Sequence, residues 1–185
     1  MSSAPGGSPS AAPDDTLSSA LNARQATAQD VLFREALYLD LQRWDEWLAL
    51  FCEDCEYRVP AWKSEHEPTA DPRSELSLIY YASRGGLEDR VWRVRSNRSV
   101  ASKPLPRTQH IVSNILVEAA PDADTLQVRS NWTVHQFKLK SREVELLFGR
   151  CEHELVRRAG RWLIRRRTAL LLNDYMPAML DFYSF

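Results

Sequence analysis

The sequence lacks an excess of charge of either sign. Its 185 residues include 24 lysines and arginines against 25 aspartates and glutamates, which gives a formal net charge of −1. A chain so balanced has no overall field that would attract nucleic acid or an anionic membrane, so neither partner is expected.

Long apolar runs and cysteines are also scarce. No run approaches the roughly 20 apolar residues of a membrane-spanning helix. The N-terminal stretch MSSAPGGSPSAAPDD has neither the basic nor the apolar region of a secretory signal. The chain has three cysteines, an odd number that fits a reducing compartment better than a disulfide framework. We therefore expect a cytoplasmic protein.

Complete cofactor-binding motifs are missing too. Phosphate-binding glycine loops and the G-x-S-x-G nucleophile motif are absent. Cys52 and Cys55 form a C-x-x-C pair, but no second pair accompanies it, so we interpret them as incidental. Cys151 and His153 match half of a Rieske ligand pattern, yet no cysteine or histidine follows to supply the other half. In a strand they would share one face, as a core cysteine beside a hydrogen-bonded histidine.

The histidines and arginines do not complete a site either. A non-haem iron site needs two histidines and a carboxylate, and the sequence leaves open whether the scattered His66, His110, His135 and His153 converge. The arginines around the last hairpin indicate solvated faces or a partner surface, since acidic residues balance them. They are Arg157, Arg158, Arg161, Arg165, Arg166 and Arg167.

What is present indicates helices followed by strands. Residues 1–24, rich in Ser, Ala, Gly and Pro, predict a disordered tail, and residues 25–185 a single domain. Thr27 is expected to cap a helix that carries apolar residues at helical spacing. A short helix should hold Trp44, Trp47, Leu48 and Phe51 on one face, before a strand that Pro60 ends.

The second half of the chain alternates apolar and polar residues. RGGLEDRVWRVRSNRSV predicts a third helix with Leu87, Val91 and Val94 toward the core. After it, RTQHIVSNILVEA, TLQVRSNWTVHQFKL, EVELLFGRCEHELVRR and RWLIRRRTALLL predict four strands, separated by the turns APDAD, KSR and RAG. We expect an α+β fold in which N-terminal helices pack on a strongly curved, mainly antiparallel sheet.

A cone of this kind can enclose a pocket. One function open to it is that of a cofactor-free isomerase or dehydratase with a general base inside the cone. The candidate residues are Asp54, His110, His135 and Tyr57. The competing interpretation is that a cone so rich in aromatic and aliphatic side chains fills its own interior.

Three collinear blocks resemble a known family, the small or β subunits of aromatic-ring-hydroxylating dioxygenases. They are REALYLDLQRWDEWLALFCEDCEYRVPAW, SRGGLEDRVWRVRSNRSVASKPLPRTQHIVSNI and RWLIRRRTALLLNDYMPAMLDFY. The resemblance runs from about residue 27 to 185, and EDRVWRVRSNRS is closest to the benzoate, toluate and anthranilate type.

The resemblance implies a metal-free subunit of a larger enzyme. It implies the curved cone fold, cystatin-like or nuclear transport factor 2-like, and no cofactor in this chain. The Rieske 2Fe-2S cluster and the mononuclear Fe(II) would lie in a large subunit that converts a benzoate-type ring to a cis-dihydrodiol or catechol. Three small subunits would form a trimer beneath three large ones in an α3β3 hexamer. An NADH-dependent reductase, with or without a ferredoxin, would deliver the electrons, and the small subunit would be mainly structural, though some influence substrate preference.

Three functions therefore stand at this point: an assembly subunit, a cofactor-free enzyme, and a ligand-binding module without chemistry. For assembly we expect structural or interface roles for Arg107, His110, Asn114, Asn173, Asp174 and Tyr183. In a strand, His110 and Asn114 would lie on one face. The apolar C-terminal residues should pack on the domain or on a neighbouring subunit, because they are too many for a free terminus.

Overall fold

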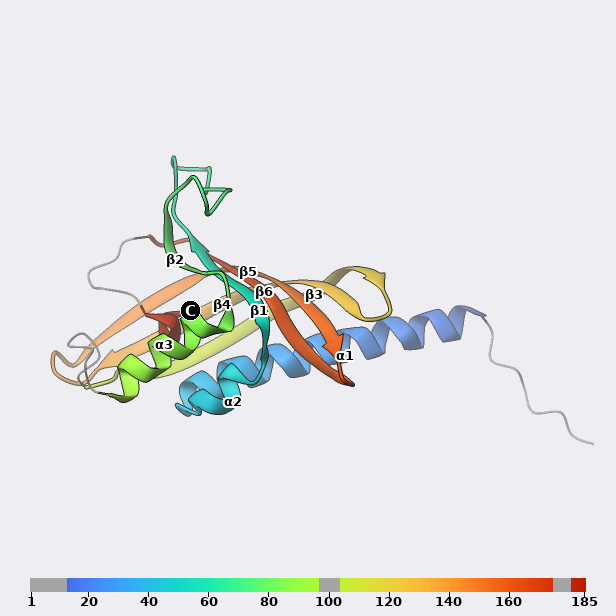
Figure 1. Cartoon of the computed structure of the whole chain (residues 1–185), viewed down its shortest axis with the longest axis horizontal. Coiled ribbons are helices and arrows are strands. Elements are labelled where there is room, and N and C mark those ends of the chain that lie inside the picture. Colours follow the sequence, from blue (N-terminus) through green and yellow to red (C-terminus); the bar gives the residue numbers. More distant parts are fainter. Residues whose placement is uncertain (1–12, 97–103, 175–180) are drawn as a thin grey trace, which may run out of the picture.

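The computed structural model describes residues 13–96, 104–174 and 181–185, with the helices mostly before the long strands (Figure 1). The elements are α1 (Pro13–Asp40), α2 (Trp44–Leu48), β1 (Phe51–Pro60), β2 (Ser77–Tyr81), α3 (Arg84–Arg95), β3 (Arg107–Asp122), β4 (Thr125–Lys138), β5 (Glu143–Arg158), β6 (Arg161–Leu171) and a 3-10 helix (Phe182–Ser184). Within these ranges, no helix is both long and apolar enough to cross a membrane.

The strands form one sheet in the order β2-β1-β6-β5-β4-β3. Neighbouring strands are antiparallel except β1 and β6, which are parallel. The turn between β5 and β6 consists of Ala159 and Gly160, whose positive φ angles of 49° and 77° suit a two-residue hairpin. The predicted α+β fold with a mainly antiparallel sheet is thus confirmed.

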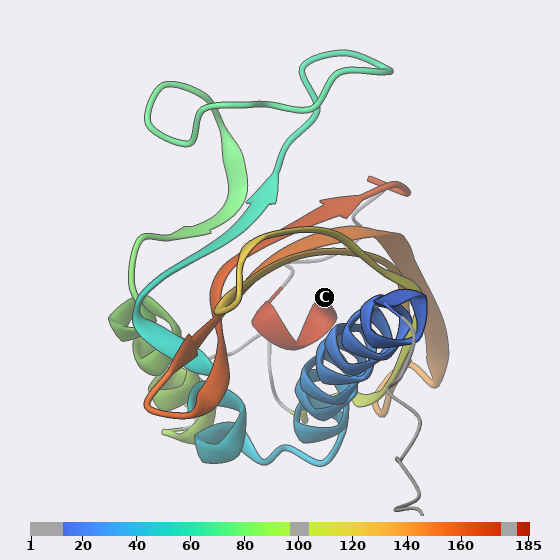
Figure 2. The same ribbon diagram turned by 90° about the vertical axis from the view of Figure 1, so that its right-hand side faces the viewer.

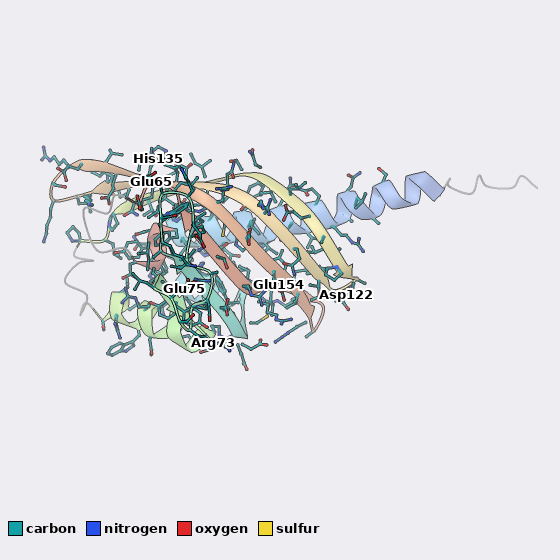
Figure 3. All side chains as sticks on the ribbon, turned by 90° about the horizontal axis from the view of Figure 1, so that it is seen from above. Glu65, Arg73, Glu75, Asp122, His135 and Glu154 are labelled. Atoms are coloured by element: carbon teal, nitrogen blue, oxygen red, sulfur yellow. The ribbon has the colours of Figure 1, made fainter. Side chains whose placement is uncertain are left out.

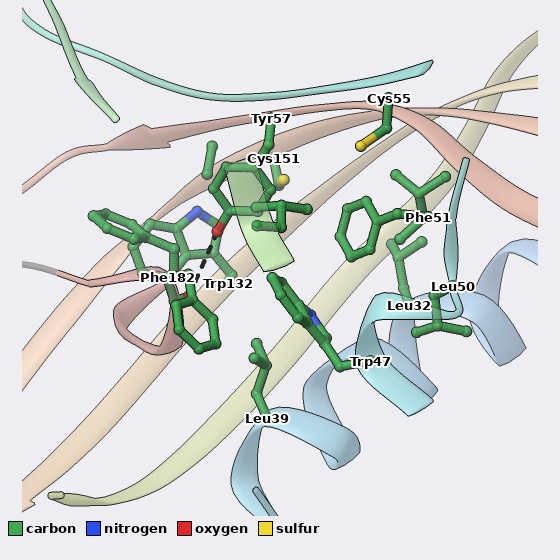
Figure 4. Packing of buried hydrophobic residues seen from close by; sticks show 14 of the residues in the cluster. Leu32, Leu39, Trp47, Leu50, Phe51, Cys55, Tyr57, Trp132, Cys151 and Phe182 are labelled. Atoms are coloured by element: carbon green, nitrogen blue, oxygen red, sulfur yellow. Dashed lines mark hydrogen bonds between the residues drawn. The ribbon is translucent and has the colours of Figure 1, made fainter. Parts of the chain in front are cut away.

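The sheet is strongly curved, and this gives it an inner and an outer face. Figure 2 shows it curling around α1 and the C-terminal 3-10 helix. Inside, Trp47 lies against the rings of Phe51 and Phe182, with centroids 5.0 and 4.9 Å away (Figure 4). The period-two alternation of β4 and β5 supplies the apolar residues of the inner face, because successive side chains point to opposite sides.

Helix α1 begins earlier than the sequence predicts. Residues 13–24, assigned to a disordered tail, are helical, and residues 1–12 lie outside the described part. Pro13 suits a first helical position, which needs no N–H donor, and several alanines favour continuation of the helix. The prediction that Thr27 is the N-cap is therefore wrong: its hydroxyl donates to the Ala23 carbonyl within the helix at 2.9 Å.

The shorter helices mostly follow the prediction. Leu87, Val91 and Val94 of α3 are buried, and the predicted residues 97–100 lie outside the described ranges. Helix α2 buries Trp44 and Trp47 but ends before Phe51, which starts β1.

Between β1 and β2, residues 61–76 form an arm that projects from the body (Figures 1 and 2). Figure 3 looks onto the outer face of the sheet, with the arm in front and α1 behind the strands.

Candidate functional site

His110 joins the end of α1 to β3. Its Nδ1 lies 2.5 Å from Asp40 Oδ1, and its backbone N–H donates to Asp40 Oδ2 at 2.9 Å. Thr108 also donates to Asp40 Oδ1, at 2.9 Å. Burial alone would raise the pKa of Asp40, but the hydrogen bonds from His110 and Thr108 hold it below its usual value. The carboxylate therefore stays ionised and fixes the helix to the sheet.

Asn114 does not share a face with His110, so that prediction is wrong. Strand β3 is irregular between Ser113 and Leu116, and Asn114 has a φ of 51°. An extra residue in a strand shifts the alternation of later side chains, which leaves Asn114 exposed. Arg107, at the start of β3, is exposed as well.

The three C-terminal candidates lie in different surroundings. Asn173 extends the β5–β6 pairing with its side chain: Oδ1 accepts from Phe148 N at 3.0 Å, and Nδ2 donates to the Leu146 carbonyl at 2.7 Å. Asp174 is exposed, whereas Tyr183 is buried. Residues 181–185 lie beneath the chain's own sheet, so this part of the terminus packs on its own domain.

The candidate bases are not gathered in the cone. Asp54 is exposed on β1, where it pairs with Arg158 at 2.7 and 3.0 Å. His135 is exposed on the outer face, where Figure 3 labels it. Tyr57 is fully buried, and its hydroxyl donates to the Phe182 carbonyl at 3.5 Å (Figure 4). Of these three side chains, only Tyr57 faces the interior.

A cluster of ionisable groups lies inside the cone instead. Glu35 of α1 accepts a hydrogen bond from His153 Nε2 of β5 at 3.1 Å and lies 2.8 Å from Arg167 Nε of β6. All three residues are at most 5% exposed. The Arg167 guanidinium also lies over the Tyr57 ring, 4.9 Å from its centroid. Because burial of an unpaired charge is very unfavourable, these contacts hold α1 in register with the sheet.

The groups of this cluster stabilise one another's charged forms. Burial alone lowers the pKa of His153, but its contacts with Cys151 and Glu35 raise it to about 9. Burial alone raises the pKa of Glu35, yet Arg167 and His153 keep it below its usual value. The cluster thus contains one carboxylate and two cations at neutral pH.

Sequence reasoning identified only part of this cluster. It placed His153 beside Cys151 on one face, and both are buried, as predicted. It assigned Arg167 to a solvated face or a partner surface, which is wrong, since Arg167 is buried and pairs with Glu35 of the same chain. The available signal was Glu35 itself, a charged residue at the helical spacing of the buried Leu32 and Leu39.

The cysteines are free and buried. Cys52, Cys55 and Cys151 form no disulfide. Burial raises the pKa of Cys55 to about 12, so its thiol is protonated at neutral pH. Across the described residues, no group of three or more His, Cys, Asp or Glu side chains is arranged to hold a metal ion.

Apolar side chains are exposed on two surfaces. On the outer face, Ile111, Val144, Leu146, Phe148 and Leu172 are each between 38% and 67% exposed, and we call them the outer apolar surface. Strand pairing places Ile111 and Phe148 on either side of Thr133, and Leu172 N donates to the Phe148 carbonyl at 2.9 Å. A second stripe follows α1, with exposed Phe33, Leu37 and Leu41. Contiguous apolar patches of this kind are typical of binding surfaces.

Comparison with known proteins agrees with this fold. Residues 34–178 match the family model described as ring hydroxylating beta subunit. The chain is 37% identical to toluate 1,2-dioxygenase subunit beta of Pseudomonas putida, over 84% of this chain and 94% of that protein.

Among solved structures, the beta subunit of the benzoate 1,2-dioxygenase from Burkholderia mallei has a TM-score of 0.70 and 34% identity, covering 85% of this chain and 94% of that one. A hexachlorocyclohexane dehydrochlorinase shares the fold alone, with a TM-score of 0.61, 15% identity and coverage of 91% and 96%. From the family match and the identity to these subunits, we conclude that this chain belongs to the β-subunit family of ring-hydroxylating dioxygenases.

Proposed function

We propose that this chain is a non-catalytic assembly subunit of the terminal oxygenase component of an aromatic-ring-hydroxylating dioxygenase. The observation that carries the proposal is that the chain's own C-terminal residues fill the cone. Phe182 and Phe185 are buried at 0% and 1% exposure, among Trp44, Trp47 and Trp132. A filled interior favours a structural role over one in which this cone holds the substrate.

The proposal extends to the partners and the reaction. The chain would form a trimer and join three large subunits in a cytoplasmic α3β3 hexamer. The large subunits would carry the Rieske 2Fe-2S cluster and the mononuclear Fe(II), and electrons would come from NADH through a reductase, with or without a ferredoxin. The substrate would be a benzoate-type aromatic acid, because relatives at 36–37% identity are named for toluate, anthranilate and benzoate. The outer apolar surface and the α1 stripe are available for these contacts.

Co-expression with the cognate large subunit tests the proposal. We expect the two chains to co-purify in equal amounts, and the purified chain alone to contain no tightly bound iron and to show no oxygenase activity. Tightly bound iron in the isolated chain, or turnover by it, would overturn the non-catalytic assignment.

The cofactor-free isomerase or dehydratase is the weaker alternative. Asp54 and His135 face solvent, so neither provides a base in the cone, which leaves His110, held through Nδ1 by Asp40, as the histidine candidate for this alternative. Activity of the isolated chain that His110→Ala or Asp54→Ala removes, without loss of the oligomer, would favour this alternative instead.

A further inference from the structure

A cavity of about 340 Å³ lies between the outer face of the sheet and the arm. Its floor comes from β1, β6, β5 and β4, and its roof from arm residues that include Trp62 and His66. The volume lies in the range of small-molecule sites, which start near 300 Å³.

Strand register brings three arginines to this floor. Arg58 of β1 lies beside Thr168 of β6, which lies beside Glu152 of β5 and then Arg129 of β4. Arg150 precedes Glu152 by two residues on β5 and therefore points to the same face, opposite Leu170. Three guanidinium groups and a single carboxylate thus line the cavity.

Two of these arginines have no acidic partner among the described residues. Arg58 is buried, at 6% exposure, yet its hydrogen bonds go only to uncharged oxygens of the arm and β2: the Ala70 carbonyl, the Thr69 carbonyl and hydroxyl, and the Ser77 hydroxyl. Arg150 is exposed and forms no ion pair within those residues.

Arg129 is the only one of the three arginines that is paired, with Glu118 at 2.9 Å and with Glu152 at 3.7 Å. The cavity is therefore cationic, although the chain as a whole is nearly neutral. A buried cation without a counter-ion favours binding of an anion.

The cavity also has apolar lining residues, and one of them is held in place by a hydrogen bond. Trp62 donates its indole N–H to the Leu171 carbonyl at 2.8 Å, which fixes its ring at the end of β6. Pro60, Pro68 and Leu170 lie around the same space. A flat ring can pack against these groups while an attached carboxylate meets a guanidinium, which binds carboxylates with paired N–H donors.

We propose that this cavity binds a small aromatic carboxylate, with Arg150 as its main charged contact and Trp62 beside its ring. A ligand-binding function is among those that the sequence leaves open, and this cavity is the place on the chain that we propose for it. It goes beyond the assembly role and does not depend on it, because the site is complete within one chain.

Titration calorimetry of the isolated full-length chain with benzoate tests the site. We expect saturable binding of one benzoate per chain, and binding of uncharged benzyl alcohol at least about tenfold weaker, since it lacks the charge-assisted hydrogen bonds. Arg150→Ala should weaken benzoate binding by about tenfold or more, and Arg150→Lys by less. The indole N–H signal of Trp62 in a nitrogen–proton NMR spectrum, assigned with Trp62→Phe, should shift as benzoate is added.

Arg157→Ala is the matched control, because Arg157 is an exposed arginine on the same strand but outside the cavity. This variant should bind benzoate like the unchanged chain. The proposal is overturned if benzoate does not saturate the chain, if Arg150→Ala binds it equally well, or if benzyl alcohol binds as tightly. None of these outcomes depends on the large subunit, so they leave the assembly proposal to its own test.

Discussion

The two faces of the sheet differ in which side chains are buried and in whether charged side chains are paired. On the inner face even charged groups are buried, as Glu35, His153 and Arg167 show, and each has an oppositely charged partner. On the outer face, apolar side chains such as Phe148 are exposed, and Arg150 has no ion pair among the described residues. Contacts inside the chain therefore pair the buried charges of the inner face, whereas among the described residues much of the outer face stays exposed to solvent.

Because of this difference, we expect changes on the inner face to affect stability and changes on the outer face to affect binding. Burial of apolar area and of paired charges is the source of folding free energy, so inner-face changes should unfold the chain. Isolated surface substitutions usually change the free energy of unfolding by less than about 0.5 kcal/mol, so outer-face changes should alter binding alone. The predictions below test this separation in order of decreasing effect on stability.

Removing the aromatic ring that fills the cone should have the largest effect. Phe182→Ala deletes a fully buried ring that packs on Trp44 and Trp47. We expect a loss of about 3–5 kcal/mol in the free energy of unfolding, measured by urea denaturation. Leu172→Ala, at an exposed residue of the outer face, is the control and should change it by less than about 0.5 kcal/mol. Equal effects of the two variants would contradict the distinction between the faces.

The buried cluster should make stability depend on pH. The pKa of His153 is raised from 6.5 to about 9 in the folded chain, so its contribution is complete below pH 6.5 and is lost as the pH rises through 9. We expect the free energy of unfolding to fall by up to about 1.4 kcal/mol per pH unit within that window. The pKa of Glu35 is lowered in the folded chain, so its contribution to the free energy of unfolding is lost as the pH falls below 4.5.

Two histidine variants test whether His153 causes this pH dependence of the free energy of unfolding. His153→Gln should flatten the slope between pH 6.5 and 9 in urea titrations, because glutamine does not titrate. His135→Gln, on the outer face, should leave the slope as it is. A slope that survives in His153→Gln would show that the buried cluster is not its source.

The elements of the fold were largely predictable, and the reason lies in their periodicity. Alternating residues in β4 and β5, and Leu87, Val91 and Val94 at helical spacing in α3, bury one side of each element. Such patterns are local, so a single sequence contains them. The start of α1 was missed because the composition of residues 13–24 resembles that of a tail, although the helix continues through them.

The sites were less predictable because they depend on contacts between distant segments. Glu35 meets Arg167 only after α1 has packed inside the cone, and Arg167 lies among five other arginines that give no sign of its burial. The bulge at Asn114 reverses the face of later residues, and no glycine or proline marks it. The cationic cavity combines residues of four strands, β1, β6, β5 and β4, with the arm, and these segments are far apart in the sequence.

Removing the contact between α1 and β3 should have an intermediate effect on the free energy of unfolding. His110→Ala removes the ring contact with Asp40 and leaves that carboxylate with fewer donors. We expect a loss of about 1–3 kcal/mol in the free energy of unfolding or a weaker assembly, with residual activity in the proposed hexamer. His66→Ala, at an exposed histidine of the arm, should have little effect on the free energy of unfolding. Complete loss of activity in an intact hexamer would instead indicate a catalytic role for His110.

The smallest change in stability should accompany a clear change in assembly. Phe148→Asp puts a charge into the outer apolar surface, where the side chain is 39% exposed. The free energy of unfolding of the isolated chain should change by less than about 0.5 kcal/mol, since the site is already partly hydrated. Co-purification with the large subunit, or self-association into a trimer, should be lost, because a carboxylate desolvated at an apolar interface has no partner.

Leu21→Asp is the matched control for Phe148→Asp, because Leu21 is also exposed but lies on the N-terminal part of α1, away from the sheet. It should leave both stability and co-purification unchanged. If Phe148→Asp assembles as well as Leu21→Asp, the outer apolar surface is not the interface, and the α1 stripe of Phe33, Leu37 and Leu41 becomes the surface to change next. If Phe148→Asp unfolds the isolated chain, the outer face contributes to folding as the inner face does, and the separation between the two faces fails.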